Sequence, residues 1–243
     1  MSAEELRQMI GRAARMVAFT GAGISAESGI PTYRGAGGVW NKYDPDKYAN
    51  VNYFFRDPSY YWSFFRDVRY GVLRDARPNE GHRALARLEQ KGVLKAVITQ
   101  NIDGLHQEAG SENVFELHGN TRRIVCLNCG AGYGIDEVRR QIETELPPSC
   151  KSCGGMLKPD VVMFGEALPE NTVELAAQEA GSCDLMVSVG SSLVVQPAAS
   201  MPVIAKRAGA VLVIVNRDPT PLDSMADLVI RQSASEVLSA LQD

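Results

Sequence analysis

Runs of consecutive apolar, largely β-branched residues recur along the chain, and stretches with helical spacing, such as residues 81–90 and 197–208, separate them. Four of the apolar runs predict strands, at residues 16–19, 95–99, 185–189 and 211–215. Strands that are apolar on both faces are typical of a parallel sheet covered by helices on both sides. The pattern therefore predicts an α/β fold with a Rossmann-like, doubly wound sheet, in which ligands bind beyond the carboxyl ends of the strands.

Two segments interrupt this alternation. Residues 36–78 are rich in aromatic residues and turn formers, with a helix expected at residues 59–74, and residues 119–159 contain four of the five cysteines. We expect the two segments to form a small domain made of a helical module and a cysteine module. The Rossmann-like domain would then comprise residues 1–35, 79–118 and 160–243.

Composition and charge narrow the classes of function. The net charge of −4 and a pI near 5.5 argue against a protein that binds nucleic acid directly through phosphate neutralisation. The N-terminal residues lack the apolar core of a secretory signal, and no apolar run approaches the length of a membrane span. We therefore expect a cytoplasmic protein with no membrane association, and a monomer.

Cys126, Cys129, Cys150 and Cys153 form the pattern C-x2-C-x20-C-x2-C. Two matched pairs at this spacing are typical of a tetrahedral zinc ribbon, in which each tight turn aims two thiolates at one ion. Disulfides are the alternative, which a cytosolic location disfavours. Because four cysteines leave no open position for water, the predicted zinc ion is structural. Cys183 stands apart and is expected to be a small buried apolar residue.

The first strand leads into a glycine-spaced turn. Gly21, Gly23 and Ala26 fit G-x-G-x-x-A directly after a strand, which indicates a dinucleotide site, although a tight turn without a ligand has the same form. A dehydrogenase would need an acidic residue at the end of the next strand, and residues 41–46 follow no apolar run. Hydride transfer is therefore disfavoured. Later strand ends offer groups for the adenine ribose, at Gly190, Ser191, Ser192 and Asn216.

Two further polar stretches follow predicted strands. One strand end carries three polar side chains, those of Gln100, Asn101 and Asp103. They could bind a carboxamide such as nicotinamide. The alternative is an Asx turn that caps the following helix and binds no ligand. His118 follows a short strand at the domain junction. It is a candidate general base, with a structural histidine as the alternative.

These motifs together carry a resemblance to a known family. In chain order they are "GAGISAESGIPTYRG", "TQNIDGLH", "ELHGN", the four cysteines, "VVMFGE", "GSSLVVQPAA" and "IVNRD". The chain resembles the sirtuins, NAD-dependent protein-lysine deacylases, and is most similar to short, core-only members of bacterial or archaeal type. The resemblance implies a Rossmann domain plus a small zinc-containing domain, with NAD and acetyl-lysine protein or peptide bound between them.

The resemblance also implies a reaction and its residues. NAD is consumed: the acyl oxygen attacks the ribose carbon that carries nicotinamide, and the acetyl group ends on ADP-ribose. His118 would activate a ribose hydroxyl, and the structural Zn2+ would take no part. Ile30, Asn101 and Asp103 would line the nicotinamide pocket, Gln100 would lie near the ribose, and Arg34 would belong to a mobile loop. The cofactor set implied in full is Gly21, Ala22, Gly23, Ser25, Ile30, Tyr33, Arg34, Gln100, Asn101, Ile102, Asp103, Gly190, Ser191, Ser192, Asn216, Arg217 and Asp218.

The same resemblance places the acyl-lysine between the two domains, where a peptide would add as a strand. Val162 would offer its carbonyl to the acyl-lysine amide, and Phe164 would form the tunnel wall with His118. Met163 stands where the family often has an aromatic residue, and Tyr33 where phenylalanine is usual.

Sirtuins that prefer succinyl-lysine carry a tyrosine and, three residues later, an arginine that bind the acid group. An alignment without gaps puts Phe65 and Val68 at these positions, which predicts a deacetylase that tolerates apolar acyl groups and is poor on succinyl-lysine. Arg66 and Arg69 are close enough that a shift of the helix by one residue could turn either of them inward.

Two other classes of function compete with the deacetylase. An NAD-dependent protein ADP-ribosyltransferase would share the cofactor site and differ in its nucleophile. A non-catalytic module that binds NAD or acyl peptides would not require His118, Asn101 and Asp103 together, and all three are present.

Overall fold

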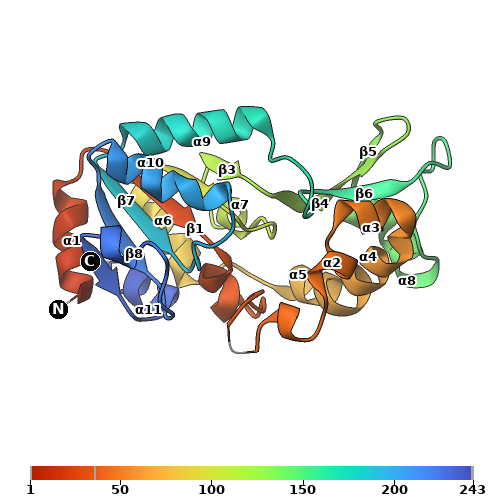
Figure 1. Cartoon of the computed structure of the whole chain (residues 1–243), viewed down its shortest axis with the longest axis horizontal. Helices are drawn as coiled ribbons and strands as arrows, with labels where there is room; N and C mark the ends of the chain where they lie inside the picture. Colours follow the sequence, from red (N-terminus) through yellow and green to blue (C-terminus); the bar gives the residue numbers. More distant parts are fainter. Residues whose placement is uncertain (1, 36, 242–243) are drawn as a thin grey trace.

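The computed structural model describes residues 2–35 and 37–241. Two lobes lie side by side along the long axis of the molecule, a large lobe that contains both termini and a small lobe (Figure 1). Within the described residues each lobe is built on its own sheet, one of six strands and one of three.

The large sheet is parallel throughout, in the order β3-β2-β1-β7-β8-β9. Its strands are β1 (Met16–Thr20), β2 (Leu94–Thr99), β3 (Val114–Glu116), β7 (Leu185–Val189), β8 (Val211–Val215) and β9 (Leu228–Ile230). The strand order reverses between β1 and β7, as in Rossmann sheets, where this switch point opens a crevice for ligands. The four strands predicted from apolar runs are confirmed, and the predicted fold class with them.

Side chains of the strands alternate between two cores, one on each face of the large sheet. Met16 and Ala18 point into one core, whereas Val17 and Phe19 point into the other. Helices that contribute to the first core are α1 (Ser2–Arg12), α6 (Glu80–Gln90) and α11 (Ala234–Ser239). Those that contribute to the second are α9 (Glu170–Ser182) and α10 (Met201–Arg207), the latter preceded by the 3-10 helix η4 (Ala198–Ser200). Burial on both faces explains why these strands are largely apolar, with few polar interruptions.

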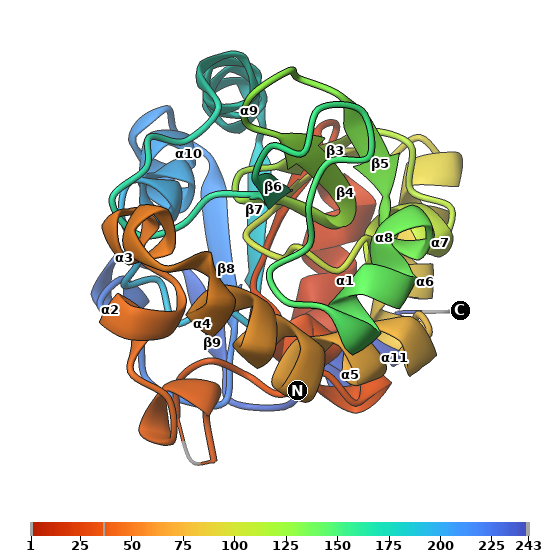
Figure 2. The same cartoon turned by 90° about the vertical axis from the view of Figure 1, so that its right-hand side faces the viewer.

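The small lobe combines an antiparallel sheet with a cluster of short helices. The sheet has the order β5-β4-β6, with β4 (Gly119–Cys126), β5 (Gly132–Gly134) and β6 (Leu157–Val161). The helices are α2 (Pro45–Tyr48), α3 (Val51–Arg56), α4 (Pro58–Phe64), α5 (Gly71–Asp75) and α8 (Ile135–Thr144). Figure 2 views the molecule from this end, with the orange helices and the green strands in front. We propose the predicted boundaries, residues 36–78 and 119–159, for this small domain.

The predicted helix at residues 59–74 contains a wide turn. Between α4 and α5 the chain forms a π-helical segment, η3 (Phe65–Tyr70), so that helical backbone runs without a break from Pro58 to Asp75. Trp62 and Phe65 on this stretch are almost fully buried in the core of the small lobe. Because a π turn accommodates an extra residue, it rotates the side chains that follow relative to a regular α-helix.

The remaining short elements are η1 (Ala22–Ser28), η2 (Val39–Asn41), α7 (Leu105–Glu108) and η5 (Asp223–Met225). Among residues 2–35 and 37–241, no helix is long and apolar enough to cross a membrane.

Candidate active site between the lobes

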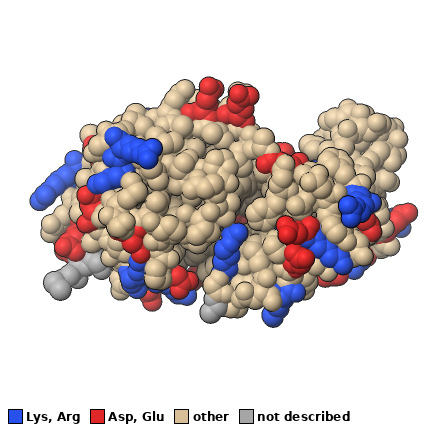
Figure 3. All heavy atoms as spheres, in the orientation of Figure 1, with Lys and Arg blue, Asp and Glu red and all other residues tan. Residues whose placement is uncertain are grey.

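A cavity of about 510 Å³ lies between the carboxyl edge of the large sheet and the small lobe. The turns after β1, β2, β7 and β8 line one side, and residues 161–166 line the other. Figure 3 shows the surface hollowed between the two lobes. The cavity thus occupies the crevice that the strand order predicts.

Most of the residues proposed from the sequence line this cavity. They are Ala22, Gly23, Tyr33, Arg34, Gln100, Asn101, Ile102, His118, Val162, Met163, Phe164, Gly190, Ser191, Ser192, Asn216, Arg217 and Asp218. A smaller pocket of about 40 Å³ shares Ala22, Tyr33, Asn101 and Ile102 with it, and Ser25, Ile30, Asp103 and Val68 are on its wall. Gly21 and Phe65 line neither space.

The glycine turn packs directly against the turn after β7. A Cβ atom on Gly23 would lie 2.6 Å from Gly190 Cα, and one on Gly21 would lie 2.9 Å from Ser191 Cα. Gly190 has a φ of 64°, and a Cβ there would lie 2.5 Å from the amide nitrogen of Ile24. Glycine is required at these positions because the two turns approach at backbone distance. The close approach brings the ends of β1 and β7 together at the base of the cavity.

Asn101 and Asp103 belong to a buried hydrogen-bond network. Asn101 Nδ2 donates to Gly21 O at 3.2 Å and to Ser25 Oγ at 3.1 Å, and Ser25 Oγ donates to Asp103 Oδ2 at 2.7 Å. Asp103 Oδ1 accepts from the Leu105 amide at 2.9 Å, which is the helix-capping contact that the sequence left open. Burial raises the pKa of Asp103, and the hydrogen bonds from Leu105 and Ser25 oppose the rise. The network therefore holds a carboxylate and a carboxamide rigidly beside the smaller pocket.

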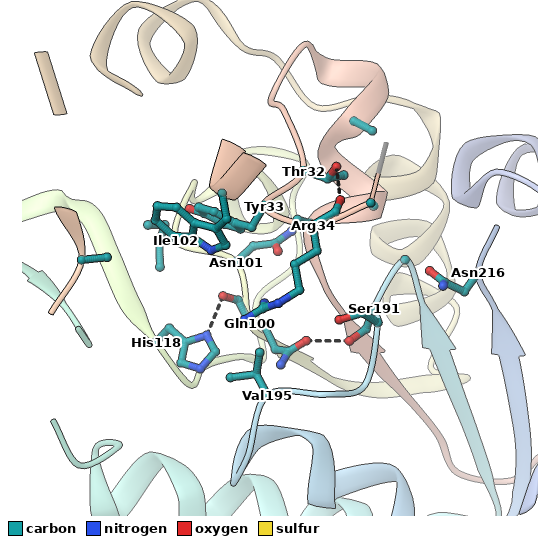
Figure 4. Close-up of a pocket in the computed structure, with 18 of the residues that line it drawn as sticks. Thr32, Tyr33, Arg34, Gln100, Asn101, Ile102, His118, Ser191, Val195 and Asn216 are labelled. Atoms are coloured by element: carbon teal, nitrogen blue, oxygen red, sulfur yellow. Dashed lines mark hydrogen bonds between the residues drawn. The ribbon is translucent and has the colours of Figure 1, made fainter. Parts of the chain in front are cut away.

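His118 is oriented by one hydrogen bond. Its Nδ1 lies 2.9 Å from Gln100 O, and because a carbonyl can only accept, Nδ1 carries the proton (Figure 4). Nε2 of the neutral ring is then an acceptor. Partial burial lowers the pKa of His118 below 6.5, with the bond to Gln100 opposing the shift, so the ring is mostly neutral at pH 7. Gln100 is itself held, because its Oε1 accepts from Ser191 Oγ at 2.6 Å.

The other histidines lie away from this cavity. His82 is buried at the start of α6, and burial lowers its pKa to about 4. His106 is also buried, and its Nε2 lies 2.9 Å from Thr20 Oγ1. Neither histidine lines either pocket, so neither is a candidate general base.

The cavity wall includes residues that the sequence did not single out. Trp40 stacks on Tyr33 with ring centroids 5.3 Å apart and reaches toward Phe164, with centroids 6.5 Å apart. Arg69 and Glu166 also line the cavity. From the sequence, Arg69 would face inward only if the helix were shifted by one residue. Its orientation depends on the π turn, which has no clear signature in sequence.

The four paired cysteines converge in the small lobe. Their sulfur atoms all lie within 4.8 Å of one another, with Cys126 and Cys153 3.6 Å apart and Cys129 and Cys150 3.7 Å apart. These separations are too long for disulfide bonds, and they match the roughly 3.8 Å expected between thiolates around a tetrahedral zinc ion. The four cysteines are therefore positioned to bind one zinc ion. Cys183 is buried apart from them, as expected.

Comparison with known proteins places these features in a family. The model of the Sir2 family matches residues 21–197. An NAD-dependent protein deacetylase of Sulfurisphaera tokodaii is 49% identical over 228 residues, which cover 93% of this chain and 89% of the relative. NAD-dependent protein deacylase 2 of Archaeoglobus fulgidus is 48% identical, with 95% of this chain and 91% of the relative covered.

Solved structures agree with the sequence comparison. A structure of a Sir2 enzyme superposes with a TM-score of 0.92 at 46% identity, covering 99% of this chain and 96% of the other. A complex described as Sir2, p53 peptide and NAD+ superposes with a TM-score of 0.91 at 39% identity, covering 98% and 96%. With a family match over more than half of the chain and relatives that align over almost all of it, the protein belongs to the Sir2 family, the sirtuins.

Proposed function

We propose that the protein is an NAD-dependent protein-lysine deacetylase that transfers the acetyl group to ADP-ribose and releases nicotinamide. The observation that carries the proposal is the orientation of His118, whose Nδ1 is bound to Gln100 O at the wall of the interlobe cavity. The relatives named as NAD-dependent deacetylases, and the Sir2 complex with peptide and NAD+, support the choice of substrates.

When bound, NAD supplies the acceptor ribose and the nicotinamide leaving group. His118 Nε2 would accept the proton of a ribose hydroxyl, which requires the neutral ring that its lowered pKa provides. Asn101 and Asp103 would hold the carboxamide of nicotinamide, and the turns that carry Gly190, Ser191 and Asn216 would hold the adenosine part. The cavity would position the two reactants, and nicotinamide leaves as a neutral molecule without a general acid. One water molecule is consumed when the acetyl group is transferred and the free lysine is released.

The substrate-facing residues come from the segment that follows β6, at the junction between the lobes. Val162, Met163 and Phe164 follow β6 and line the cavity, and Phe164 keeps 38% of its surface exposed. We propose that Val162 binds the acyl-lysine amide and that Phe164 forms the tunnel wall. We also propose a cytoplasmic, monomeric enzyme that acts on acetylated proteins or peptides.

The direct test is an incubation of the protein with NAD and an acetyl-lysine peptide. We expect equal amounts of nicotinamide, deacetylated peptide and acetyl-ADP-ribose, quantified by mass spectrometry. ADP-ribosylated protein in place of acetyl-ADP-ribose would identify an ADP-ribosyltransferase. Binding of both ligands without any product would identify a non-catalytic module.

The structure changes the expectation for acidic acyl groups. Phe65 is 1% exposed within the aromatic core and does not line the cavity, and Val68 lines only the smaller pocket. Arg69 lies on the wall of both spaces, with its guanidinium carbon 5.2 Å from the Tyr33 ring centroid and 4.9 Å from that of Phe64. Among the described residues it forms no ion pair. Although Arg69 also interacts with Tyr61, an arginine on the wall without a carboxylate partner could bind a carboxylate, so succinyl-lysine is not expected to be excluded.

Replacement of Arg69 by methionine should lower kcat/KM for succinyl peptide relative to acetyl peptide by roughly tenfold or more, because a charge-assisted hydrogen bond is lost. Arg66→Met is the matched control, since Arg66 lies on the same helix but is paired with Asp67 at 2.6 Å. Steady-state rates on both peptides provide the measurement. Wild-type protein with no turnover of succinyl peptide would restore the original expectation.

A further inference from the structure

A buried ion pair lies behind the segment proposed to bind the acyl-lysine. Lys158 Nζ on β6 lies 3.0 Å from Glu166 Oε2, and the two side chains are 8% and 27% exposed. Glu166 lines the interlobe cavity, whereas Lys158 does not. The pair therefore connects the interior of the small lobe with the cavity wall.

Both charged groups also bind the backbone between them. Lys158 Nζ donates to Val161 O at 2.7 Å, and the Met163 amide donates to Glu166 Oε2 at 2.7 Å. The Glu166 amide closes the loop by donating to Met163 O at 3.0 Å. One ammonium and one carboxylate thus hold the backbone groups of two alternate residues, Val161 and Met163.

This arrangement determines the direction of the residue between them. In an extended segment, backbone groups of successive residues point to opposite edges, and those of alternate residues point to the same edge. With Val161 and Met163 held on the inner edge, Val162 faces the other way, where its amide donates to His118 O at 2.9 Å. The carbonyl proposed for the acyl-lysine amide therefore belongs to the residue whose orientation the ion pair sets, directly beside the proposed general base.

A second anchor fixes the far end of the segment. The Phe164 amide donates to Ala49 O at 2.8 Å, and the Val51 amide donates to Phe164 O at 3.0 Å. These bonds tie Phe164 to the helical module, and the bond from the Val162 amide to His118 O helps to hold the Val161–Val162 peptide plane. The rotation of the Val162–Met163 plane, which carries the Val162 carbonyl, is left to the bond between the Met163 amide and Glu166. Removal of the pair should therefore alter the direction of the Val162 carbonyl, while the segment stays attached to the helical module.

We propose that Lys158 and Glu166 are positioning residues for the acyl-lysine substrate. The inference rests on the proposed function, because it assigns the Val162 carbonyl to substrate binding. Stability alone is a weak explanation for such a pair, because apolar residues of similar volume are often as stable as a buried ion pair. Apolar side chains would fill the same space, but they would not orient Val161 O and the Met163 amide.

The test replaces both charges together, in Lys158→Met with Glu166→Leu, so that no unpaired charge is buried. We expect KM for the acetyl-lysine peptide to rise about tenfold, with KM for NAD unchanged within about twofold and the unfolding midpoint close to wild type. Arg139→Met with Glu143→Leu removes an exposed pair on α8 and is the matched control, with no change in either KM. The single variant Lys158→Arg retains the charge and the donors, and it should keep most of the wild-type peptide affinity.

Other outcomes would overturn the proposal. An unchanged peptide KM in the folded double variant, or an equal rise in the KM for NAD, would reduce the pair to a structural role. If the double variant does not fold, Glu166→Ala, at the more exposed end of the pair, removes the acceptor of the Met163 amide, and the same comparison of KM values applies to it. Wild-type protein that binds labelled acetyl-lysine peptide but releases no nicotinamide would refute the proposed function instead, and the pair would then be tested by peptide affinity alone.

Discussion

Replacement of His118 by alanine should lower kcat by about a hundredfold or more, the usual contribution of a positioned general base. The reason is the loss of the acceptor at Nε2, which the bond between Nδ1 and Gln100 O keeps unprotonated. NAD affinity and the unfolding midpoint should change little, because His118 is only partly buried and packs at the edge of the cavity. Nicotinamide release, calorimetric NAD binding and thermal unfolding measure the three quantities.

The pH profile gives an independent check of the same role. Since burial lowers the pKa of His118 below 6.5, the wild-type rate should be near its plateau at pH 7 and should fall only as the pH drops through that lowered value. The residual rate of His118→Ala should lack this acidic limb. A variant that keeps wild-type turnover would rule out the general-base assignment, and one that loses NAD binding as well would indicate a role in cofactor binding.

Loss of zinc should have the second large effect, unfolding of the small lobe. Structural zinc sites contribute an apparent binding free energy of about 10 kcal/mol or more, which is comparable with the whole stability of a typical domain. Treatment with a chelator, or Cys126→Ser, should therefore remove hydrogen-exchange protection from β4 to β6 and abolish deacetylation. The large lobe should stay protected, because its two cores pack on the two faces of the six-stranded sheet, away from the cysteines.

Cys183→Ser is the matched control for the zinc prediction. This cysteine is buried outside the four-cysteine cluster, so native mass spectrometry should still find one zinc ion per chain in the variant. Wild-type protein without zinc, or a chelated protein that remains active and protected in β4, would contradict the assignment.

Several features could be predicted because they depend on short stretches of chain. The runs at residues 185–189 and 211–215 are apolar at every position except Ser188 because both faces of the sheet are covered, and they became β7 and β8 with the same bounds. β9, with only three residues, was too short to stand out from its surroundings. The four cysteines were recognisable because each pair closes its own tight turn.

The site was predicted less completely, and the errors have a physical cause. Asp103 was assigned to the right neighbourhood, but its bonds to Ser25 and Leu105 needed the packing of η1 against the turn after β2. Phe65 was assigned to the substrate side by an alignment without gaps, and it lies in the core of the small lobe. The π turn puts Arg69 on the wall instead, and such a turn depends on how the helix packs against its neighbours.

The sequence by itself determined four strands of the large sheet, the zinc ligands and the candidates for catalysis, because periodicity, spacing and strand-end position are local properties of the chain. Only the tertiary structure decided which side chains share the cavity and which hydrogen bonds orient them. His118 is oriented by Gln100, 18 residues away in the chain, and Lys158 and Glu166 hold the backbone of Val161 and Met163, through contacts whose geometry depends on how the segments around the cavity pack. A displacement of about one ångström in that packing would break these bonds, and no local pattern of residues encodes distances to that accuracy.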